Sequence, residues 1–398
     1  MKCKITGKKI KPFMSFGKMP IANGFLSKKN FNKEYLFEMK VGFSNKISLF
    51  QLDDHPKPKM MFNKNYPFYT SSSKFMINHF KQYANWVKKN YLKDSKNIIE
   101  IGSNDGTFLK NFKGNKTNIL GVEPSSNVAI KARKNGIKTL NNFFNYKNIS
   151  KLKKLKNNTN VICAANAICH VPNLKNLIKG VNFLLHKKGV FIFEEPYLGS
   201  MYEKTSYDQI YDEHIFMFSA TSVKKIFNLF GFELIDLKPQ KTHGGSMRYV
   251  IGRKGMFKIK NIVSKILKVE NKKNISNYKG CLKFKKKCED SKNKLRKKIM
   301  NILKKGKNIA GYAATSKSTT ILNYCGINNK HIDFICDTTK DKIGKFTPRT
   351  HIPIVNMDHF KKNIPDYTFL FAWNHKKEIF KKERKNSIKT KWFAHVKL

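Results

Sequence analysis

The segment YDEHIFMFS, residues 211–219, places a phenol, two carboxylic acids and an imidazole at four consecutive positions, Tyr211 to His214. Histidine suits proton abstraction near neutral pH, because its ordinary pKa is about 6.5. If the segment is extended, Tyr211 and Glu213 share a face and can hold one ligand. A packed core histidine ahead of an aromatic run is the alternative. From these residues alone, the two interpretations stand equally.

A second candidate is IIEIGSNDGTFL, in which an apolar strand ends at Glu100, Gly102 and Gly106 bracket a turn, and Phe108 opens a helix. The G-x-x-x-G spacing differs from the dinucleotide fingerprint, which argues against NAD. The next strand, NILGVEP, ends in Glu123, a carboxylate suited to the two hydroxyls of a ribose. Together these elements predict an adenosine-containing ligand without a phosphate cradle, and S-adenosylmethionine is the common one. A purely structural strand–turn–helix is the alternative.

Polar residues after later strands are weaker candidates. Asn166 and His170 in CAANAICHVPNL follow the third strand and lie near the predicted methyl donor, although a capping Asn and a packed His would look the same. HGGSMRYVIG is either a plain hairpin or a place where backbone approaches a sugar or diphosphate. Its candidate contacts are His243, Gly244, Ser246 and Arg248.

The segment IAGYAATSKSTTILNYCG has a strand, a loop and a helix start, with Ser316 and Lys317 at the turn. Hydroxyls, backbone amides and a lysine at a helix start suit an anion, and a nucleotide diphosphate is the expected ligand. Asp337, at the end of the strand IDFICD, is the counterpart of Glu123 and binds a second ribose or only caps the loop.

The elements that carry these residues alternate along the chain. SSSKFMINHFKQYANWVKKNYL predicts an amphipathic helix behind a serine cap, because its apolar residues recur every three or four positions. NIIEIG, NVICAANA and VFIFEEP are predicted strands, and helices follow in NVAIKARKNG, in LKNLIKGVNFLLHKKG ending at Gly189, and in TSVKKIFNLFGF ending at Gly231. Such alternation predicts a mostly parallel, Rossmann-like sheet covered by helices. A second, smaller doubly wound α/β domain is expected from NIAGYAA onward.

Composition limits the remaining function classes. The chain of 398 residues has 80 Lys+Arg and 26 Asp+Glu, a formal charge of +54. Because Lys is spread evenly and Arg is scarce, we do not expect a nucleic-acid partner, although an anionic substrate would be attracted. Seven cysteines in no paired framework, no apolar leader and no long apolar stretch predict a reduced, cytoplasmic protein without a membrane partner.

The chain resembles the sugar C-methyltransferase family over nearly its whole length. The resemblance rests on MPIANGFL, YPFYTSSS, EIGSNDG, GVEPS, ANAICHVPNL, EEPYL, YDEHIFMFS, HGGSMR, GYAATSKSTTILNYCGI and DTTKDKIGKFTPRTHIPI. It implies an enzyme that uses S-adenosylmethionine to methylate a ring carbon beside the ketone of a nucleotide-linked keto-deoxy sugar. The implied domains are a small irregular N-terminal domain (1–70), a methyltransferase domain (71–255), a helical connector (256–305) and an α/β domain that helps bind the nucleotide-sugar (306–398).

The resemblance also implies roles for single residues. His214 is the expected base, assisted by Tyr211 and Glu213, and either Tyr66 or Tyr69 closes the site. The expected cofactor contacts are Glu100, Gly102, Asn104, Gly106, Glu123, Pro124 and Asn166. The expected substrate contacts are Asn166, His170, His243, Gly244, Ser246, Arg248, Ser316, Lys317 and Asn323. Asp212 stands where the family commonly has His, and we expect no catalytic role for it.

The largest departure from the family lies near the amino terminus. The family has a zinc knuckle of two C-x-x-C pairs, and a structural zinc site needs four Cys or His ligands. Only Cys3 is present here, with Ser44 and Ile47 where the later pair would fall. We therefore expect this domain to fold without metal.

Three functions remain open at this stage. The favoured one is the nucleotide-sugar C-methyltransferase, acting through proton abstraction and an enolate. A methyltransferase acting on an oxygen or nitrogen of another molecule is the second. A non-catalytic nucleotide-sugar-binding descendant is the third, and a dehydrogenase is the most distant.

Overall fold

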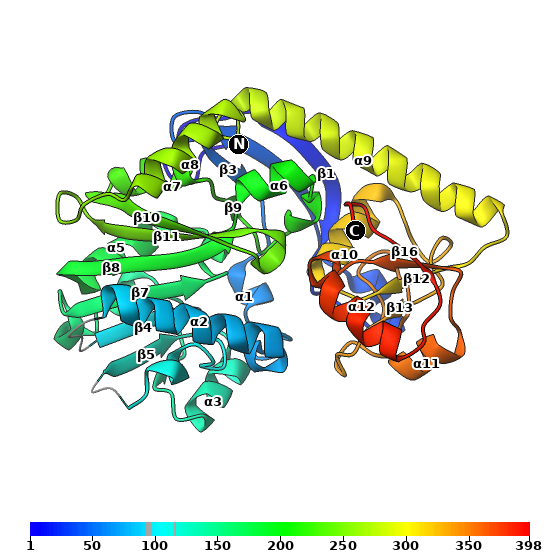
Figure 1. The fold of residues 1–398 in the computed structure, drawn as a ribbon, viewed down its shortest axis with the longest axis horizontal. Coiled ribbons are helices and arrows are strands. Elements are labelled where there is room, and N and C mark those ends of the chain that lie inside the picture. Colours follow the sequence, from blue (N-terminus) through cyan, green and yellow to red (C-terminus); the bar gives the residue numbers. More distant parts are fainter. Residues whose placement is uncertain (93–96, 115–116) are drawn as a thin grey trace.

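The computed structural model describes residues 1–92, 97–114 and 117–398. These residues form three β-sheets of four, seven and five strands, with helices packed between and around them. Figure 1 shows the seven-stranded sheet and the C-terminal sheet on opposite sides of the molecule, with strand β1 between them. The predicted α/β architecture is confirmed.

The N-terminal sheet is more regular than the irregular domain we expected. Its strands are β1 (Pro12–Pro20), β2 (Leu36–Ser44), β3 (Leu49–Leu52) and β9 (Phe216–Met217), all antiparallel. The strand-like pieces FEMKVGF and ISLFQL are β2 and β3. The fourth strand comes from the segment after residues 211–214, and Phe50 and Gln51 pair with Met217 and Phe216. The N-terminal sheet therefore holds the chain directly after the candidate base.

The seven-stranded sheet has the order β10-β11-β8-β7-β4-β5-β6. Strands β4 to β8 run parallel, and β11 runs antiparallel to its neighbours β8 and β10. The strand order reverses at β4, and ligands of open α/β sheets bind at such a switch point, beyond the carboxyl ends of the strands. The strands are β4 (Asn97–Ile101), β5 (Asn118–Val122), β6 (Thr139–Leu140), β7 (Thr159–Ala165), β8 (Leu185–Pro196), β10 (Phe232–Gln240) and β11 (Ser246–Arg253).

Helix α2 matches its prediction most closely. Ser73 caps it by accepting a hydrogen bond from the backbone amide of Met76, and the next turns bury Phe80, Tyr83 and Val87. The α-helices from the N-terminal segment through this domain are α1 (Pro58–Met61), α2 (Lys74–Tyr91), α3 (Ser126–Lys134), α4 (Tyr146–Ile149), α5 (Leu174–Leu184), α6 (Leu198–Lys204) and α7 (Ala220–Asn228). The short 3-10 helices are η1 (Lys28–Lys33), η2 (Thr70–Ser72), η3 (Leu109–Phe112), η4 (Lys153–Leu155), η5 (Ile168–His170), η6 (Tyr207–Gln209), η7 (Thr242–Gly244) and η8 (Trp373–His375).

The predicted end of one helix at Gly189 is wrong. Helix α5 ends at Leu184, and Leu185 already begins strand β8, so that Gly189 lies inside the strand. A Cβ atom at Gly189 would come within 2.8 Å of the carbonyl oxygen of Thr159. The glycine therefore permits close approach of β7 rather than ending a helix.

Two helices connect this domain to the C-terminal sheet, α8 (Asn261–Lys272) and α9 (Tyr278–Lys304). Figure 1 shows α9 running along one edge of the molecule from one sheet to the other. The C-terminal sheet is parallel, in the order β14-β13-β12-β15-β16, with β12 at its centre as in a doubly wound fold. Its elements are β12 (Ile309–Tyr312), α10 (Ser316–Cys325), β13 (Ile335–Cys336), β14 (Ile354–Val355), α11 (Met357–Lys362), β15 (Tyr367–Leu370), α12 (Lys376–Lys385) and β16 (Lys391–Phe393). No helix among the described residues is long and apolar enough to cross a membrane.

Arg248, which we expected to contact the substrate, belongs to a buried ion network instead. Its guanidinium donates to Glu194 Oε2 at 2.7 and 3.1 Å and stacks 3.6 Å from the ring centre of Tyr83. His79 on α2 lies 2.7 Å from Glu194 Oε1. Burial raises the pKa of Glu194, but His79 and Arg248 reverse this and lower it to about 2. The network ties α2 to β8 and β11.

We predict that Arg248→Ala lowers the free energy of unfolding by about 3 kcal/mol, because it leaves a buried carboxylate with its main counter-charge removed. Urea unfolding monitored by circular dichroism measures the loss. Arg384→Ala on the exposed side of α12 is the control and should change it by less than about 0.5 kcal/mol. Adding Glu194→Gln to Arg248→Ala should recover part of the loss; equal effects of the two arginine variants would contradict this role.

Candidate functional site

A cavity of about 1140 Å³ lies between the seven-stranded sheet and the C-terminal sheet. Its wall includes the carboxyl ends of β4, β5 and β7, the start of α10 and the turn at residues 211–214, here called the YDEH turn. Pockets for one small ligand usually measure about 300–1,000 Å³, so this cavity has room for a cofactor and a second ligand. The predicted residues on its wall are Tyr66, Tyr69, Glu100, Gly102, Asn104, Glu123, Pro124, Asn166, His170, Tyr211, Glu213, His214, His243, Ser316 and Lys317.

Two carboxylates line the cavity where β4 and β5 end. Glu123 accepts hydrogen bonds from the backbone amides of Asn104 at 2.9 Å and Ser125 at 2.8 Å, one on each oxygen. Burial raises its pKa, and the two amides oppose that rise. Glu100 is also buried, and its Oε2 atom has no partner among the described residues. Burial, Glu123 and Asp105 raise the pKa of Glu100 well above its ordinary value.

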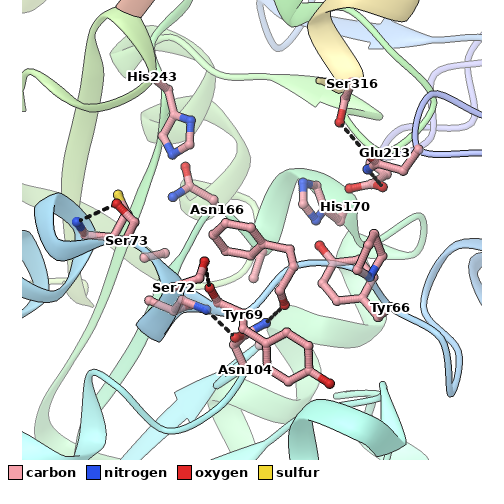
Figure 2. A pocket seen from close by; sticks show the side chains of 18 of the residues that line it. Tyr66, Tyr69, Ser72, Ser73, Asn104, Asn166, His170, Glu213, His243 and Ser316 are labelled. Atoms are coloured by element: carbon pink, nitrogen blue, oxygen red, sulfur yellow. Dashed lines mark hydrogen bonds between the residues drawn. The ribbon is translucent and has the colours of Figure 1, made fainter. Parts of the chain in front are cut away.

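Asn104 joins this end of the cavity to residues 66–73, the aromatic segment. Its side chain accepts from the amide of Thr70 at 2.9 Å and donates to the carbonyl of Phe68 at 3.0 Å. Asn104 has a φ of 48°, a left-handed conformation that Asn tolerates better than most residues. Figure 2 shows Asn104 beside Tyr69 and Ser72. The loop after β4 and the aromatic segment therefore form one wall.

The two tyrosines that the sequence did not distinguish occupy different surroundings. Tyr69 accepts a hydrogen bond at 3.0 Å from Asn127 in the first turn of α3, which follows β5. Burial, then Glu213 and Glu123, raise the pKa of the Tyr66 phenol well above the ordinary value. The acidic side chains of the YDEH turn therefore act on the phenol of Tyr66.

The YDEH turn is compact rather than extended, so the condition under which Tyr211 and Glu213 would share a strand face is not met. The amide of His214 donates to the carbonyl of Tyr211 at 2.9 Å, which closes a turn. His214 Nδ1 lies 2.7 Å from the carbonyl oxygen of Gln209, and Nε2 lies 2.7 Å from the Tyr211 hydroxyl. Because a carbonyl only accepts, we assign the proton to Nδ1 and leave Nε2 as the acceptor.

The electrostatics of the turn keep its imidazole neutral. Burial, reinforced by nearby His170, lowers the pKa of His214 well below its ordinary value. Burial raises the pKa of Glu213 to about 7, against the opposing effect of its hydrogen bond from Asn23. Asp212 does not line the cavity, and its Oδ1 accepts from the backbone amide of Ala22 at 3.1 Å. The turn therefore offers a neutral base beside a carboxylate that titrates near pH 7.

Two further polar side chains face the cavity without partners. Asn166, with a φ of 52°, leaves Oδ1 unpaired, and His170 leaves Nε2 unpaired, within the described part of the chain. Burial lowers the pKa of His170 to about 4, and its ring stacks 5.3 Å from that of His214. The 3-10 helix that carries His170 is held by Glu195, whose Oε1 atom accepts from three consecutive amides at 2.7–3.3 Å. The motif EEPYL did not reveal this anchoring role.

His243 lines the cavity from the opposite wall, with a φ of 51° and with Nε2 unpaired among the residues described. Burial and the nearby Lys317 lower its pKa to about 3. Figure 2 shows its ring directed toward Asn166. The neutral imidazole is therefore available as a hydrogen-bonding group for a ligand.

The C-terminal wall repeats the construction at β4 and β5. Asp337, at the end of β13, accepts from the amides of Ala314 at 2.8 Å and Thr339 at 2.7 Å, as Glu123 does from its two amides. At the start of α10, Lys317 donates to Asn374 Oδ1 at 3.1 Å and lies 5.1 Å from the ring centre of Trp373. Burial lowers the pKa of Lys317. This wall presents hydroxyls, amides and a buried ammonium.

Five predicted contacts do not line the cavity: Gly106, Gly244, Ser246, Arg248 and Asn323. A side chain at Gly106 would meet Ile137, and one at Gly244 would meet the ring of Trp373, so both glycines allow packing. Ser246 donates to the carbonyl of Thr242, and Asn323 donates to carbonyls of Thr319 and Pro348. Proximity in sequence to cavity residues made these positions look functional.

The positions of the family's zinc knuckle hold no zinc ligand set. The amide of Thr6 donates to Cys3 Sγ at 3.4 Å, while Ser44 at the end of β2 and Ile47 in the turn after it are both buried. In the rest of the described chain, Cys169, His170 and His214 bring one donor atom each within 4.8 Å of one another. Burial and Glu195 raise the pKa of the Cys169 thiol well above its ordinary value, which disfavours the thiolate that metals bind.

Three family models match successive parts of the chain. They are described as "Putative zinc binding domain" (residues 3–62), "Methyltransferase domain" (76–237) and "C-methyltransferase C-terminal domain" (241–396). The chain is 27% identical over 374 residues to the C-methyltransferase NovU of Streptomyces niveus, covering 93% of this chain and 89% of that protein.

Two solved structures each match a little under half of the chain. A protein from Pyrococcus horikoshii OT3 is 17% identical with a TM-score of 0.39, covering 48% of this chain and 97% of its own. The plantazolicin methyltransferase BpumL, solved with S-adenosylhomocysteine, is 11% identical with a TM-score of 0.35, covering 44% of this chain and 82% of its own. The three successive domain matches and the near full-length relative make the chain similar to C-methyltransferases along most of its length.

Proposed function

We propose that the enzyme methylates the ring carbon beside the ketone of a nucleotide-linked 4-keto-deoxy sugar, and that His214 removes the proton from that carbon. The observation that carries this proposal is the shared cavity. One wall has the two carboxylates at the ends of β4 and β5, and another has the neutral imidazole of the YDEH turn. The carbon beside the ketone becomes a nucleophile only after its proton is removed. A C-methyltransferase therefore needs a base as well as a site for the methyl donor.

The β4–β5 end of the cavity suits S-adenosylmethionine, which supplies an electrophilic methyl group when bound. Each oxygen of Glu123 accepts one amide and retains capacity for a ribose hydroxyl, because a carboxylate offers about four acceptor positions. The unpaired oxygen of Glu100 and the unpaired Oδ1 of Asn166 would accept from the ammonium of the amino-acid part. We assign Gly102, Asn104 and Pro124 to the same subsite, where such a ligand would give Glu100 Oε2 and Asn166 Oδ1 hydrogen-bond partners.

The YDEH end would perform proton transfer. The carbon's proton passes to His214 Nε2, and the electron pair of the C–H bond delocalises onto the ketone oxygen as an enolate. The carbonyl of Gln209 already accepts from Nδ1 and stabilises the imidazolium that forms. A phenol that donates to the enolate oxygen, from Tyr66 or Tyr211, would lower the barrier by about 3 kcal/mol. The Tyr211 hydroxyl must first release Nε2.

The C-terminal wall would hold the nucleotide. Lys317 and Ser316 lie at the start of α10, where backbone amides and the helix dipole favour an anion. Asp337 has the same pair of amide contacts as Glu123 and would accept from a second ribose. A diphosphate next to Lys317 would leave the sugar between the two walls, beside the YDEH turn. This arrangement suits a nucleotide-sugar better than a free sugar.

The test is incubation of the purified enzyme with carbon-13 methyl-labelled S-adenosylmethionine and a panel of nucleotide-linked 4-keto-6-deoxy sugars, followed by NMR. A labelled methyl on a ring carbon beside the ketone is the expected result. A label on oxygen or nitrogen would favour the second function. Cofactor binding without any label transfer would favour the non-catalytic descendant.

We predict that Glu123→Ala weakens binding of S-adenosylmethionine at least about tenfold, because it removes the ribose acceptor and frees two amides of the loop. Isothermal titration calorimetry measures the dissociation constant. Glu203→Ala, on an exposed position of α6, is the matched control. Equal affinities for Glu123→Ala and wild type would remove Glu123 from the cofactor site.

We also predict a difference between the two tyrosines of the aromatic segment. Tyr66→Phe should lower kcat about 100-fold, because it removes a donor near the enolate. Tyr69→Phe should mainly raise KM for S-adenosylmethionine, because its hydroxyl contacts Asn127 in the first turn of α3, just after Glu123 and Pro124. Steady-state kinetics with both substrates distinguish these effects. The reverse pattern would assign the closing role to Tyr69.

A further inference from the structure

A loop of the N-terminal segment enters the cavity, although sequence analysis assigned it no role. Asn23 lies in the motif MPIANGFL and lines the cavity wall. Its side-chain amide nitrogen donates to Glu213 Oε1 at 2.7 Å. Its side-chain oxygen accepts from the hydroxyl of Ser316 at 2.9 Å. Figure 2 shows Ser316 and Glu213 on either side of these bonds. The side chain of Asn23 thus joins the N-terminal segment to the YDEH turn and to the start of α10.

The backbone beside Asn23 is anchored from both sides. The amide of Ala22 donates to Asp212 Oδ1 at 3.1 Å, and the carbonyl of Ala22 accepts from Thr319 Oγ1 at 2.8 Å. Asp212 and Thr319 are both buried, so these bonds are shielded from water. The loop therefore has a fixed position between the YDEH turn and α10, and Asn23 has little freedom to move.

The orientation of the Asn23 amide follows from its two neighbours. An ionised carboxylate only accepts, so the nitrogen of Asn23 must face Glu213. The Ser316 hydroxyl then donates to the oxygen on the other side. Glu213 Oε1 is occupied in this way, and the described residues provide no hydrogen bond to Oε2. That second oxygen is left for a ligand in the cavity.

We propose that Asn23 is a positioning residue for Glu213, holding its carboxylate ionised and oriented toward a hydroxyl of the substrate. The part that concerns the substrate rests on the proposed function; the part that concerns the carboxylate does not. The proposal gives the N-terminal segment a role in the site that needs no zinc. It also makes the contact of α10 with Asn23 part of the active-site geometry.

Other titratable groups interact electrostatically with Glu213. They are Tyr66 of the aromatic segment, Cys169 of η5, and Tyr211 and Asp212 of the same turn. Of these, Asp212 is acidic and also carries a raised pKa through burial and Glu213. Because Asn23 lowers the pKa of Glu213 while burial raises it to about 7, loss of Asn23 should raise it further.

The experiment is a carboxyl carbon-13 NMR titration of glutamate-labelled protein, with the Glu213 signal assigned by its absence in Glu213→Gln. We expect the pKa of Glu213 to rise by about one pH unit in Asn23→Ala, and by more in Asn23→Asp, where a charge replaces the donor. Asn and Asp have nearly the same shape, so a packing role alone would leave Asn23→Asp close to wild type. Asn30→Ala, at an exposed position of the 3-10 helix η1 in the same N-terminal segment, is the control.

Kinetics complete the test. The acid limb of the kcat/KM profile should move to higher pH by the same amount as the Glu213 pKa, because the ionised form is the one that holds the substrate. An unchanged Glu213 pKa in both Asn23 variants would overturn the proposal. If the pKa moves but wild type methylates no keto sugar, the role of Asn23 toward Glu213 stands and the proposed function fails.

Discussion

The site depends on the burial of the YDEH turn. Its ionisable side chains are removed from water, and each buried polar group needs a partner that the protein must supply. The partners come from different domains: Gln209 holds His214, and the loop of Ala22 and Asn23 holds Asp212 and Glu213. That loop is in turn held by α10. The strand pairing of β3 with β9 completes the enclosure, so the domains must assemble before the base acquires its properties.

Local patterns were enough to predict much of the fold. The serine cap and apolar spacing of α2, the alternating strands and the glycine-bracketed turn after β4 each report on neighbouring residues only. The acids that end β4 and β5 could be placed at one edge because parallel strands end on the same side of a sheet. The same reasoning predicted that Asp337 lies at the carboxyl end of a strand in the second α/β unit, as Glu123 does in the first.

The missing parts depend on contacts between distant segments. Arg248 looked like a ligand contact because it follows two glycines. In the structure its guanidinium instead donates to the buried Glu194 of another strand. Asn23 is 190 residues from Glu213 along the chain, and no local pattern links them. Tyr211 and Glu213 would have shared a face only if the segment were extended, and the hydrogen bond from the amide of His214 to the carbonyl of Tyr211 closes it into a turn instead. These pairings cannot be predicted from a single sequence, because the paired residues lie far apart along the chain.

The most direct test of the account is proton exchange without methyl transfer. The enzyme would be incubated in heavy water with a nucleotide-linked 4-keto-6-deoxy sugar and S-adenosylhomocysteine, which has no methyl to donate, and followed by proton NMR. The account predicts that wild type replaces the proton beside the ketone with deuterium and that His214→Gln loses this exchange at least about 100-fold. Equal exchange by the two proteins would contradict the assignment of His214 as the base.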